Sequence, residues 1–113
     1  MRALAPNGVA STQAKLFRGL ADPSRLSILI ALKAGPRNVG QLVRTTGQSQ
    51  PNVSQHLNCL RCCGLVVSER KGRFVYYRLA SPRLLRLLAL ADGVLDEVKD
   101  LIDACENYNG RMS

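Results

Sequence analysis

Apolar residues of this 113-residue chain recur at helical spacing in its first half, then alternate, then return to helical spacing. A short helix is predicted from Thr12 to about Ala21. A second helix begins at Asp22-Pro23, an N-cap followed by proline, and ends at Ala34-Gly35-Pro36. Because the second helix is apolar around most of its surface, we expect it to form the centre of the core. Its apolar side chains are Leu26, Ile28, Leu29, Ile30 and Leu32.

A third and a fourth helix are predicted on either side of a glycine turn. Asn38 and Gln41 have the spacing of a capping box that opens the third helix, and Gly47 suits its C-terminus. Ser49 or Gln50 can cap the fourth helix. The apolar residues of the fourth helix lie on one narrow stripe formed by Val53, Leu57 and Leu60. A helix, a glycine turn and a polar helix together predict a helix-turn-helix.

A hairpin and a last helix complete the predicted fold. The segment VVSERKGRFVYYRL alternates like two strands around a Lys71-Gly72 turn, and we call this hairpin the wing. The last helix begins at Ser81-Pro82, and its apolar residues are spaced like a coiled-coil seam: Leu84, Leu88, Ala91, Leu95, Val98, Ile102 and Cys105. The predicted fold class is mainly α with a small β-hairpin. It is a winged helix-turn-helix with five helices and a two-stranded wing.

The fourth helix carries neutral polar side chains where an ordinary solvated helix would carry a mixture of Glu and Lys. Amide and hydroxyl groups can both donate to and accept from base edges and phosphates in a major groove, although a merely solvated face is the alternative. The candidate DNA-contacting residues of this helix and its N-terminus are Gln48, Ser49, Gln50, Asn52, Ser54, Gln55 and His56. For His56, packing is an alternative to DNA contact.

Charge is distributed unevenly along the chain, whose formal net charge is +8. Residues 1–81 hold 12 Lys or Arg and 2 Asp or Glu, whereas residues 82–113 hold 4 and 6, so the two parts carry +10 and −2. Arg70, Lys71 and Arg73 lie at the tip of the wing, where we expect them to contact backbone phosphate. The basic part predicts a polyanionic partner, and the lack of a basic amphipathic helix argues against a membrane surface.

The length predicts one domain over residues 12–107, with a loose N-terminal tail at 1–11 and a C-terminal tail at 108–113. No apolar leader segment or membrane-spanning run is recognisable, so we expect a cytoplasmic protein. In that compartment disulfides are rare, and the four cysteines more often indicate metal or redox chemistry.

Three of the cysteines lie at the end of the fourth helix. Cys59 and Cys63 are four residues apart, so both sulfurs can reach one soft ion, whereas Cys62 points away from them. Cys59 and Cys62 also form a C-x-x-C sequence, but a helix C-terminus opposes the thiolate that a redox enzyme needs. No catalytic constellation is recognisable elsewhere, so we predict neither an enzyme nor an organic substrate.

Two stretches resemble the ArsR/SmtB family of winged-helix metal-sensing repressors. They are GLADPSRLSIL at Gly19 to Leu29 and VSQHL at Val53 to Leu57, which leads on to Gly64-Leu65-Val66. The resemblance covers about residues 13–106. It implies a homodimer that binds an inverted-repeat operator in double-stranded DNA and releases it on binding metal. The Cys-Val-Cys sequence of many arsenic sensors is absent, since Val39 to Val43 read VGQLV.

The sequence around the cysteines resembles the CmtR-type cadmium/lead sensors of that family. This resemblance implies a metal site made by Cys59, Cys63 and Cys105, with Cd(II) or Pb(II) as the inducer and Zn(II) or As(III) as further candidates. The alternative is an arsenite- or redox-sensing repressor of the same fold that uses Cys62 and Cys63. Other roles remain open for these residues: packing for Cys59 and Cys63, a position in the apolar seam for Cys105, and a metal-ligand role for His56. The acidic residues of the last helix suit a solvated face.

Overall fold

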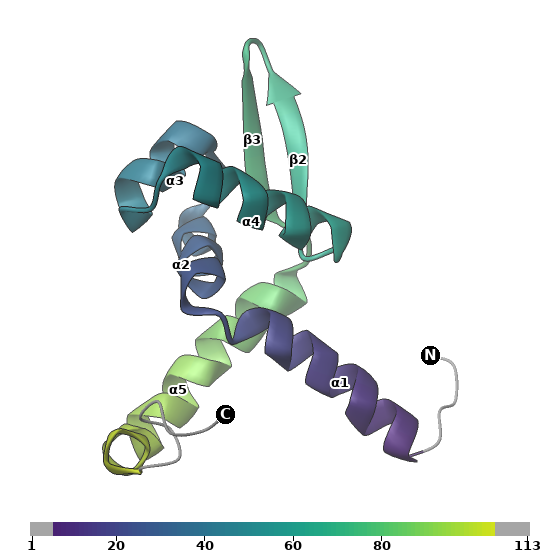
Figure 1. The fold of residues 1–113 in the computed structure, drawn as a ribbon, viewed down its shortest axis with the longest axis vertical. Helices are drawn as coiled ribbons and strands as arrows, with labels where there is room; N and C mark the ends of the chain where they lie inside the picture. The colour runs from purple at the N-terminus through teal and green to yellow at the C-terminus, as the bar shows by residue number, and fades with distance from the viewer. Residues whose placement is uncertain (1–5, 106–113) are drawn as a thin grey trace. The chain divides into compact units, whose positions relative to one another are not determined.

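The computed structural model describes residues 6–105, which contain five α-helices and a three-stranded antiparallel sheet (Figure 1). The elements follow in the order α1 (Pro6–Leu20), α2 (Pro23–Ala31), a 3-10 turn (Leu32–Ala34), β1 (Arg37–Asn38), α3 (Val39–Thr46), α4 (Gln50–Cys62), β2 (Val66–Lys71), β3 (Phe74–Leu79) and α5 (Pro82–Ala104). The predicted winged helix-turn-helix is confirmed. By its contacts the chain divides into two compact units, with the boundary between Ser81 and Pro82.

Helix α1 is longer than we predicted. Residues 6–11, which we assigned to a loose tail, form its first part, and the Thr12 hydroxyl donates to the carbonyl of Gly8 at 2.9 Å. Pro6 is the first helical residue, a position where its fixed φ is already suitable and its missing N–H costs nothing. We had interpreted Pro6 and Gly8 as loop residues. The remainder of the predicted tails, 1–5 and 108–113, lies outside the described residues.

Helix α2 forms the centre of the core in the first unit, as predicted. The Asp22 carboxylate caps its N-terminus by accepting from the backbone N–H of Arg25 at 2.9 Å. Ile28 and Leu29 are fully buried, and Leu32 in the 3-10 turn is nearly so. Ile30 is 52% exposed, so the apolar surface of this helix extends beyond its buried face. A helix turns about 100° per residue, and one step past Leu29 leaves the buried face.

Helices α3 and α4 form the helix-turn-helix (Figure 1). The Asn38 side chain accepts from the N–H of Gln41, and the Gln41 side chain accepts from the N–H of Asn38, each at 2.9 Å, so the predicted capping box is present. Gly47 ends α3 with φ 73°, a left-handed conformation that favours glycine. Ser49, one of the two predicted caps, is the N-cap of α4, and its side chain accepts from the backbone N–H of Asn52.

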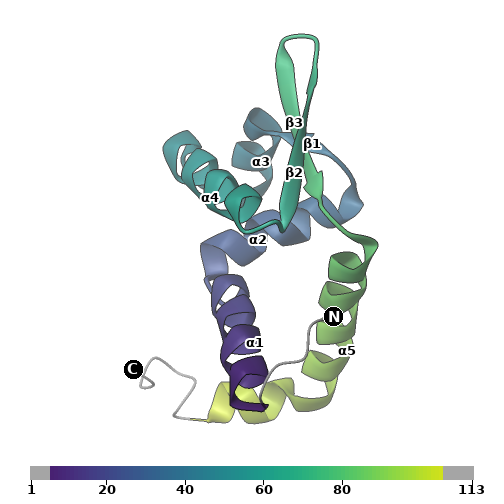
Figure 2. The same ribbon diagram turned by 90° about the vertical axis from the view of Figure 1, so that its right-hand side faces the viewer.

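The sheet has the strand order β1-β3-β2, and the β2–β3 hairpin projects beyond α3 and α4 (Figure 2). We predicted only two strands. The third is the two-residue β1, which pairs with Tyr76 and Tyr77 because Asn38 must be extended to cap α3. The hairpin turn is Gly72-Arg73 instead of the predicted Lys71-Gly72, since Lys71 still pairs with Phe74. Gly72 has φ 64°, which a tight hairpin turn requires at its first central residue.

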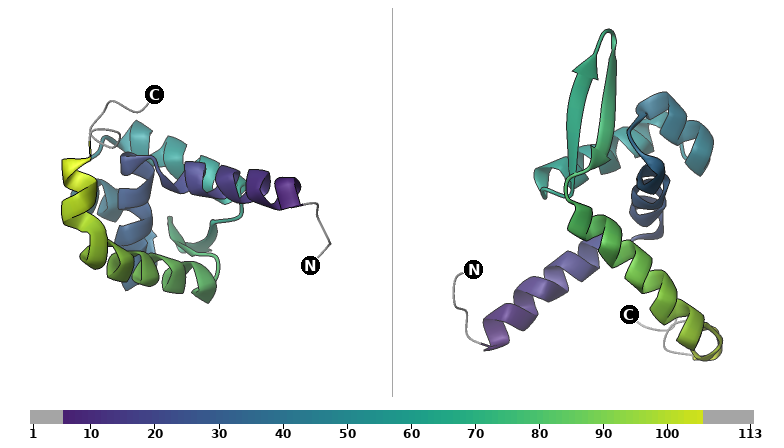
Figure 3. Two further views of the ribbon diagram at one scale, coloured as in Figure 1. Left: turned by 90° about the horizontal axis from the view of Figure 1, so that it is seen from below. Right: turned by 180° about the vertical axis from the view of Figure 1, so that it is seen from behind.

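Helix α5 makes up nearly all of the described part of the second unit and is one continuous, curved helix (Figure 3). Of the predicted seam, Leu84 and Leu88 are buried and Leu95 is 48% exposed. A second set of apolar side chains, Leu90, Val94 and Leu101, is more exposed still, and the predicted seam did not include it. Cys105 follows the last helical residue, Ala104, and its backbone N–H donates to the carbonyl of Ile102 at 3.1 Å.

Candidate DNA interface and metal centre

Helix α4 has one buried stripe and one open polar face. Val53, Leu57 and Leu60 are buried at 0–1% exposure, which anchors the helix in the core of the first unit. The opposite face therefore points outward. Ser49, Gln50, Ser54 and Gln55, four of the predicted DNA-contacting residues, are exposed there. An exposed helix face of neutral donors and acceptors is suited to enter a major groove, and we call α4 the recognition helix.

Two other predicted DNA-contacting residues are engaged within the protein. The Gln48 amide nitrogen donates to the carbonyl of Ser24 at 2.8 Å, and its amide oxygen accepts from the Asn52 amide at 2.8 Å. Both side chains are half-buried. They join the first turn of α4 to the first turn of α2, so they position the recognition helix. Their contact with DNA stays a prediction.

His56 lies against the N-terminus of α2. Its Nε2 is 3.8 Å from Oδ2 of Asp22, and its side chain is 18% exposed. The same Asp22 oxygen caps α2 through the N–H of Arg25. This placement supports the packing role that we kept open for His56, and it restrains the recognition helix one turn before Cys59.

The wing presents three exposed cations next to its turn. Arg70 Nε donates to the carbonyl of Gly72 at 3.2 Å, and Lys71 Nζ lies 3.8 Å from a Glu69 carboxylate oxygen. The guanidinium of Arg73 lies over the Phe74 ring at 5.3 Å from its centroid. All three side chains are exposed, and the exposed ion pair to Glu69 is worth little in water. They remain available for phosphate.

The structure brings Cys59 and Cys63 together at the end of α4. Cys63 caps the helix, and its backbone N–H donates to the carbonyl of Cys59 at 3.0 Å, so the two residues lie one helical turn apart. Desolvation raises the pKa of the Cys63 thiol, and the neighbouring Cys59 raises it further, whereas Arg25 acts in the opposite direction. Two thiols one helical turn apart can share one soft cation once their protons leave.

Cys62 and Cys105 are placed differently. Cys62 is the last residue of α4 and, like Cys59 and Cys63, it is exposed. Cys105 is half-buried and belongs to the second unit. Within residues 6–105 of one chain, no three His, Cys, Asp or Glu side chains are gathered as a metal site. The predicted set of Cys59, Cys63 and Cys105 therefore stays a prediction.

The surroundings of Cys63 were not predicted from the sequence. A hollow of about 350 Å³ lies beside this thiol, lined by Lys15, Leu16 and Gly19 of α1 and by Leu65. Arg25 reaches the same region, since its Nη1 donates to the carbonyl of Gly19 at 3.0 Å. Arg25 lay in one of the stretches that resembles the family, but no local pattern indicates that it approaches a cysteine nearly forty positions later.

A helix-turn-helix with an exposed polar recognition helix and a basic wing defines the class of winged-helix DNA-binding regulators. Residues 22–68 match the family model described as "Bacterial regulatory protein, arsR family". A relative from Streptomyces lividans, described as "Probable mercury resistance operon repressor", is 38% identical over 99 residues, which cover 88% of this chain and 79% of the relative. The chain belongs to the arsR family of bacterial regulatory proteins, so it is a transcriptional regulator and not an enzyme.

Two solved structures are similar over most of the chain. The homodimeric winged helix-turn-helix DNA-binding domain of a possible ArsR-family regulator from Mycobacterium bovis has a TM-score of 0.72 and 34% identity, covering 86% of this chain and 92% of that one. The cadmium metal-sensor CMTR from Mycobacterium tuberculosis has a TM-score of 0.60 and 51% identity, covering 67% of this chain and 79% of that one.

Among residues 6–105, no helix is long and apolar enough to cross a membrane.

Proposed function

We propose that this regulator is a dimeric, metal-responsive repressor. It binds an inverted-repeat operator in double-stranded DNA and releases it on binding Cd(II) or Pb(II) through Cys59, Cys63 and Cys105. Zn(II) and As(III) are the other candidate inducers, because thiolates bind them as well. The similarity to a cadmium sensor at 51% identity supports the proposal.

The observation that carries the proposal is the pair of neighbouring thiols, Cys59 and Cys63, one turn apart at the end of the recognition helix. Thiolate sulfur is the preferred ligand of soft cations, and two sulfurs one helical turn apart can ligate one ion. The same helix carries the exposed Ser54 and Gln55 within about one turn of Cys59. Ligation at one end of a short rigid helix therefore acts on the residues that would read bases.

The response would follow from thermodynamic linkage. The Gln48 and His56 contacts hold the recognition helix against α2. If ligation by Cys59 and Cys63, completed by Cys105, is compatible only with another orientation of that helix, metal and operator each weaken the other. The two binding free energies are then coupled reciprocally, typically by about 1–3 kcal/mol. As the third ligand, Cys105 would connect the recognition helix to α5, which we expect to pair with its counterpart in the dimer.

The experiment that tests the proposal measures operator binding by the full chain while cadmium is added under anaerobic, reducing conditions. We expect thiolate-to-metal absorption to grow with bound cadmium, while fluorescence anisotropy of the labelled operator falls. Peroxide treatment in a parallel sample distinguishes the alternative in which Cys62 and Cys63 form a redox switch. Operator release by peroxide but not by cadmium would overturn the metal-sensing proposal.

A further inference from the structure

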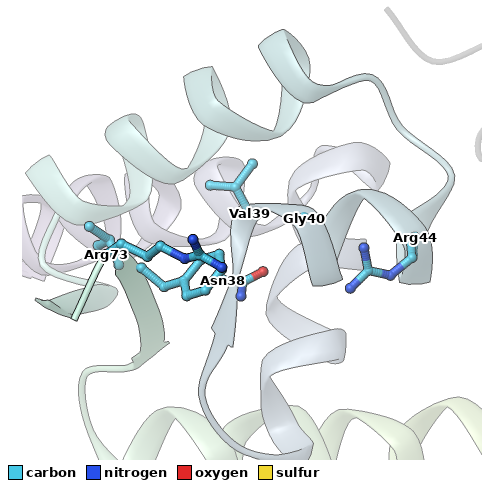
Figure 4. A pocket seen from close by; sticks show the side chains of 7 residues that line it. Asn38, Val39, Gly40, Arg44 and Arg73 are labelled. Carbon is cyan, nitrogen blue, oxygen red and sulfur yellow. The ribbon is translucent and has the colours of Figure 1, made fainter. Parts of the chain in front are cut away.

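A second basic site lies away from the thiols, between the first turn of α3 and the wing. It is a hollow of about 360 Å³, with Asn38, Gly40 and Arg44 on one side and Arg73 and Phe74 on the other. Figure 4 shows Arg73 reaching in from the wing and Arg44 from α3, with Asn38 between them. We call this hollow the arginine notch. Arg44 was not among the DNA-contacting residues predicted from the sequence.

The charges of the arginine notch are not neutralised by the protein. None of its lining residues is acidic, and within residues 6–105 neither guanidinium forms an ion pair. The Arg73 guanidinium carbon lies over the Phe74 ring, 5.3 Å from the ring centroid. This contact covers one face of the guanidinium and leaves its N–H donors free. Guanidinium groups are planar and more weakly hydrated than ammonium groups, and they bind phosphate oxygens in pairs. The notch therefore suits a phosphate.

The absence of a side chain at Gly40 keeps the notch open. A Cβ atom at this position would lie 3.6 Å from Nη1 of Arg44 and 3.5 Å from Oδ1 of Asn38. Helical side chains point back toward the N-terminus of their helix, so the Arg44 guanidinium lies over the first turn, four residues earlier. Any larger side chain at position 40 would occupy the space between Asn38 and Arg44.

We propose that the arginine notch binds one phosphate of the DNA backbone, with Arg44 and Arg73 on either side of it. The inference rests on the proposed DNA-binding function. When the second helix of a helix-turn-helix enters the major groove, the first helix crosses the backbone. The notch joins that first helix, α3, to the wing. The contact is independent of base sequence, and it fixes the register of both elements on the duplex.

The test measures the affinity of the full chain for operator and for unrelated duplex at several salt concentrations. Arg44→Ala and Arg73→Ala should each weaken binding to both duplexes and lower the slope of log K against log salt by about 0.9, the value for one phosphate. Because both side chains meet the same phosphate, their effects should combine non-additively. Arg18→Ala is the matched control, since it removes the same charge from an exposed position on α1.

A second variant tests the shape of the notch without changing charge. Gly40→Leu should fill the notch and weaken binding to both duplexes. Gly40→Ala should bind nearly as the wild type does, because 3.5 and 3.6 Å are ordinary contact distances. Gly40 lies in the first turn of α3 and is not one of the glycines with positive φ, so its backbone accepts both side chains. Inorganic phosphate at matched ionic strength should not stabilise the wild type more than Arg44→Ala against thermal unfolding.

Several outcomes would overturn the proposal that the arginine notch binds a DNA phosphate. If Arg44→Ala and Gly40→Leu both bind DNA as Arg18→Ala does, no phosphate enters it. If inorganic phosphate stabilises the wild type selectively, the notch serves a free phosphate compound and not DNA. A wild-type chain that binds no duplex at all would overturn the proposed function together with the notch.

Discussion

Cys63 ends the recognition helix by donating its backbone N–H to the carbonyl of Cys59, and the neighbouring Cys59 also raises the pKa of the Cys63 thiol. One pair of residues therefore forms both the last turn of the helix and the candidate metal ligands. A ligand that holds both sulfurs acts directly on the geometry of that turn. In the proposed function, this relationship would link soft-metal binding to DNA recognition without a long relay through the protein.

Replacing the thiols one at a time should distinguish those that bind cadmium from those that do not. Cys59→Ser and Cys63→Ser should each weaken cadmium binding by at least about tenfold, the loss that even an outer-shell change typically causes. Cys62→Ser is the matched control, since it removes an adjacent exposed thiol and should leave cadmium binding nearly intact. Titration followed by thiolate-to-metal absorption measures all three affinities. Equal losses in the three variants would contradict the pairing of Cys59 with Cys63.

Cys105 should affect switching more than metal affinity. We expect Cys105→Ser to keep operator binding and appreciable cadmium affinity, because Cys59 and Cys63 remain, while much of the cadmium-induced release is lost. Operator anisotropy with and without cadmium measures the coupling, which should fall from about 1–3 kcal/mol toward zero. If Cys62→Ser abolishes the response and Cys105→Ser does not, the site is the adjacent Cys62-Cys63 pair. An arsenite or redox sensor would then be the better interpretation.

Metal affinity should rise with pH. The folded chain raises the pKa of the Cys63 thiol through desolvation and the neighbouring Cys59, so a proton competes with metal more strongly there than at an ordinary thiol. Apparent cadmium affinity should increase until the pH exceeds the raised pKa. Without metal, the pH dependence of folding stability has the opposite sign. The stability that the protonated Cys63 thiol contributes is lost as the pH rises through the pKa of this thiol in the folded chain.

The alkylation rate of Cys63 against pH measures this pKa directly when the other thiols are accounted for. In a chain that also carries Cys62→Ser and Cys105→Ser, Cys59→Ser should shift the Cys63 titration to lower pH, because it removes the neighbouring thiol that raises the Cys63 pKa. The same chain with Cys59 intact is the control. A shift to higher pH on loss of Cys59 would show that Cys59 favours the thiolate.

The wing should supply affinity without sequence preference. Replacing Arg70, Lys71 and Arg73 by Ala together should weaken binding to any duplex. The salt slope should fall by about 0.9 for each DNA phosphate that the variant no longer neutralises. Fluorescence anisotropy at several salt concentrations, with operator and unrelated DNA, measures both quantities. An unchanged slope would remove the wing from the interface.

Dimerisation should depend on the exposed apolar face of α5. Leu95→Asp should weaken dimerisation by at least about 10–100-fold, since burying one leucine is worth about 1.5–3 kcal/mol. The chain should then lose its preference for an inverted repeat. Sedimentation at micromolar concentration measures the oligomeric state, and a wild-type monomer there would contradict the prediction. From the sequence we would also choose Leu88→Asp, but Leu88 is already buried within one chain, so that variant would test folding.

The sequence by itself determined the elements whose signals are local. Caps at Asp22, Asn38 and Ser49 and the glycine at Gly47 act within a few residues, so the helices of the helix-turn-helix could be predicted from their ends. The buried stripe of α4 followed from helical periodicity. The i, i+4 spacing of Cys59 and Cys63 was likewise enough to bring two sulfurs together.

Only the tertiary structure decided which polar side chains are free and which are engaged. Gln48 and Asn52 resemble the exposed Ser54 and Gln55 in the sequence, but the carbonyl that holds Gln48 belongs to Ser24, twenty-four positions earlier. The same holds for Asp22 beside His56, Arg25 near Cys63 and Arg73 opposite Arg44. Such contacts join residues distant in sequence through the packing of whole elements, and a periodic pattern specifies the buried face of an element but not its neighbours.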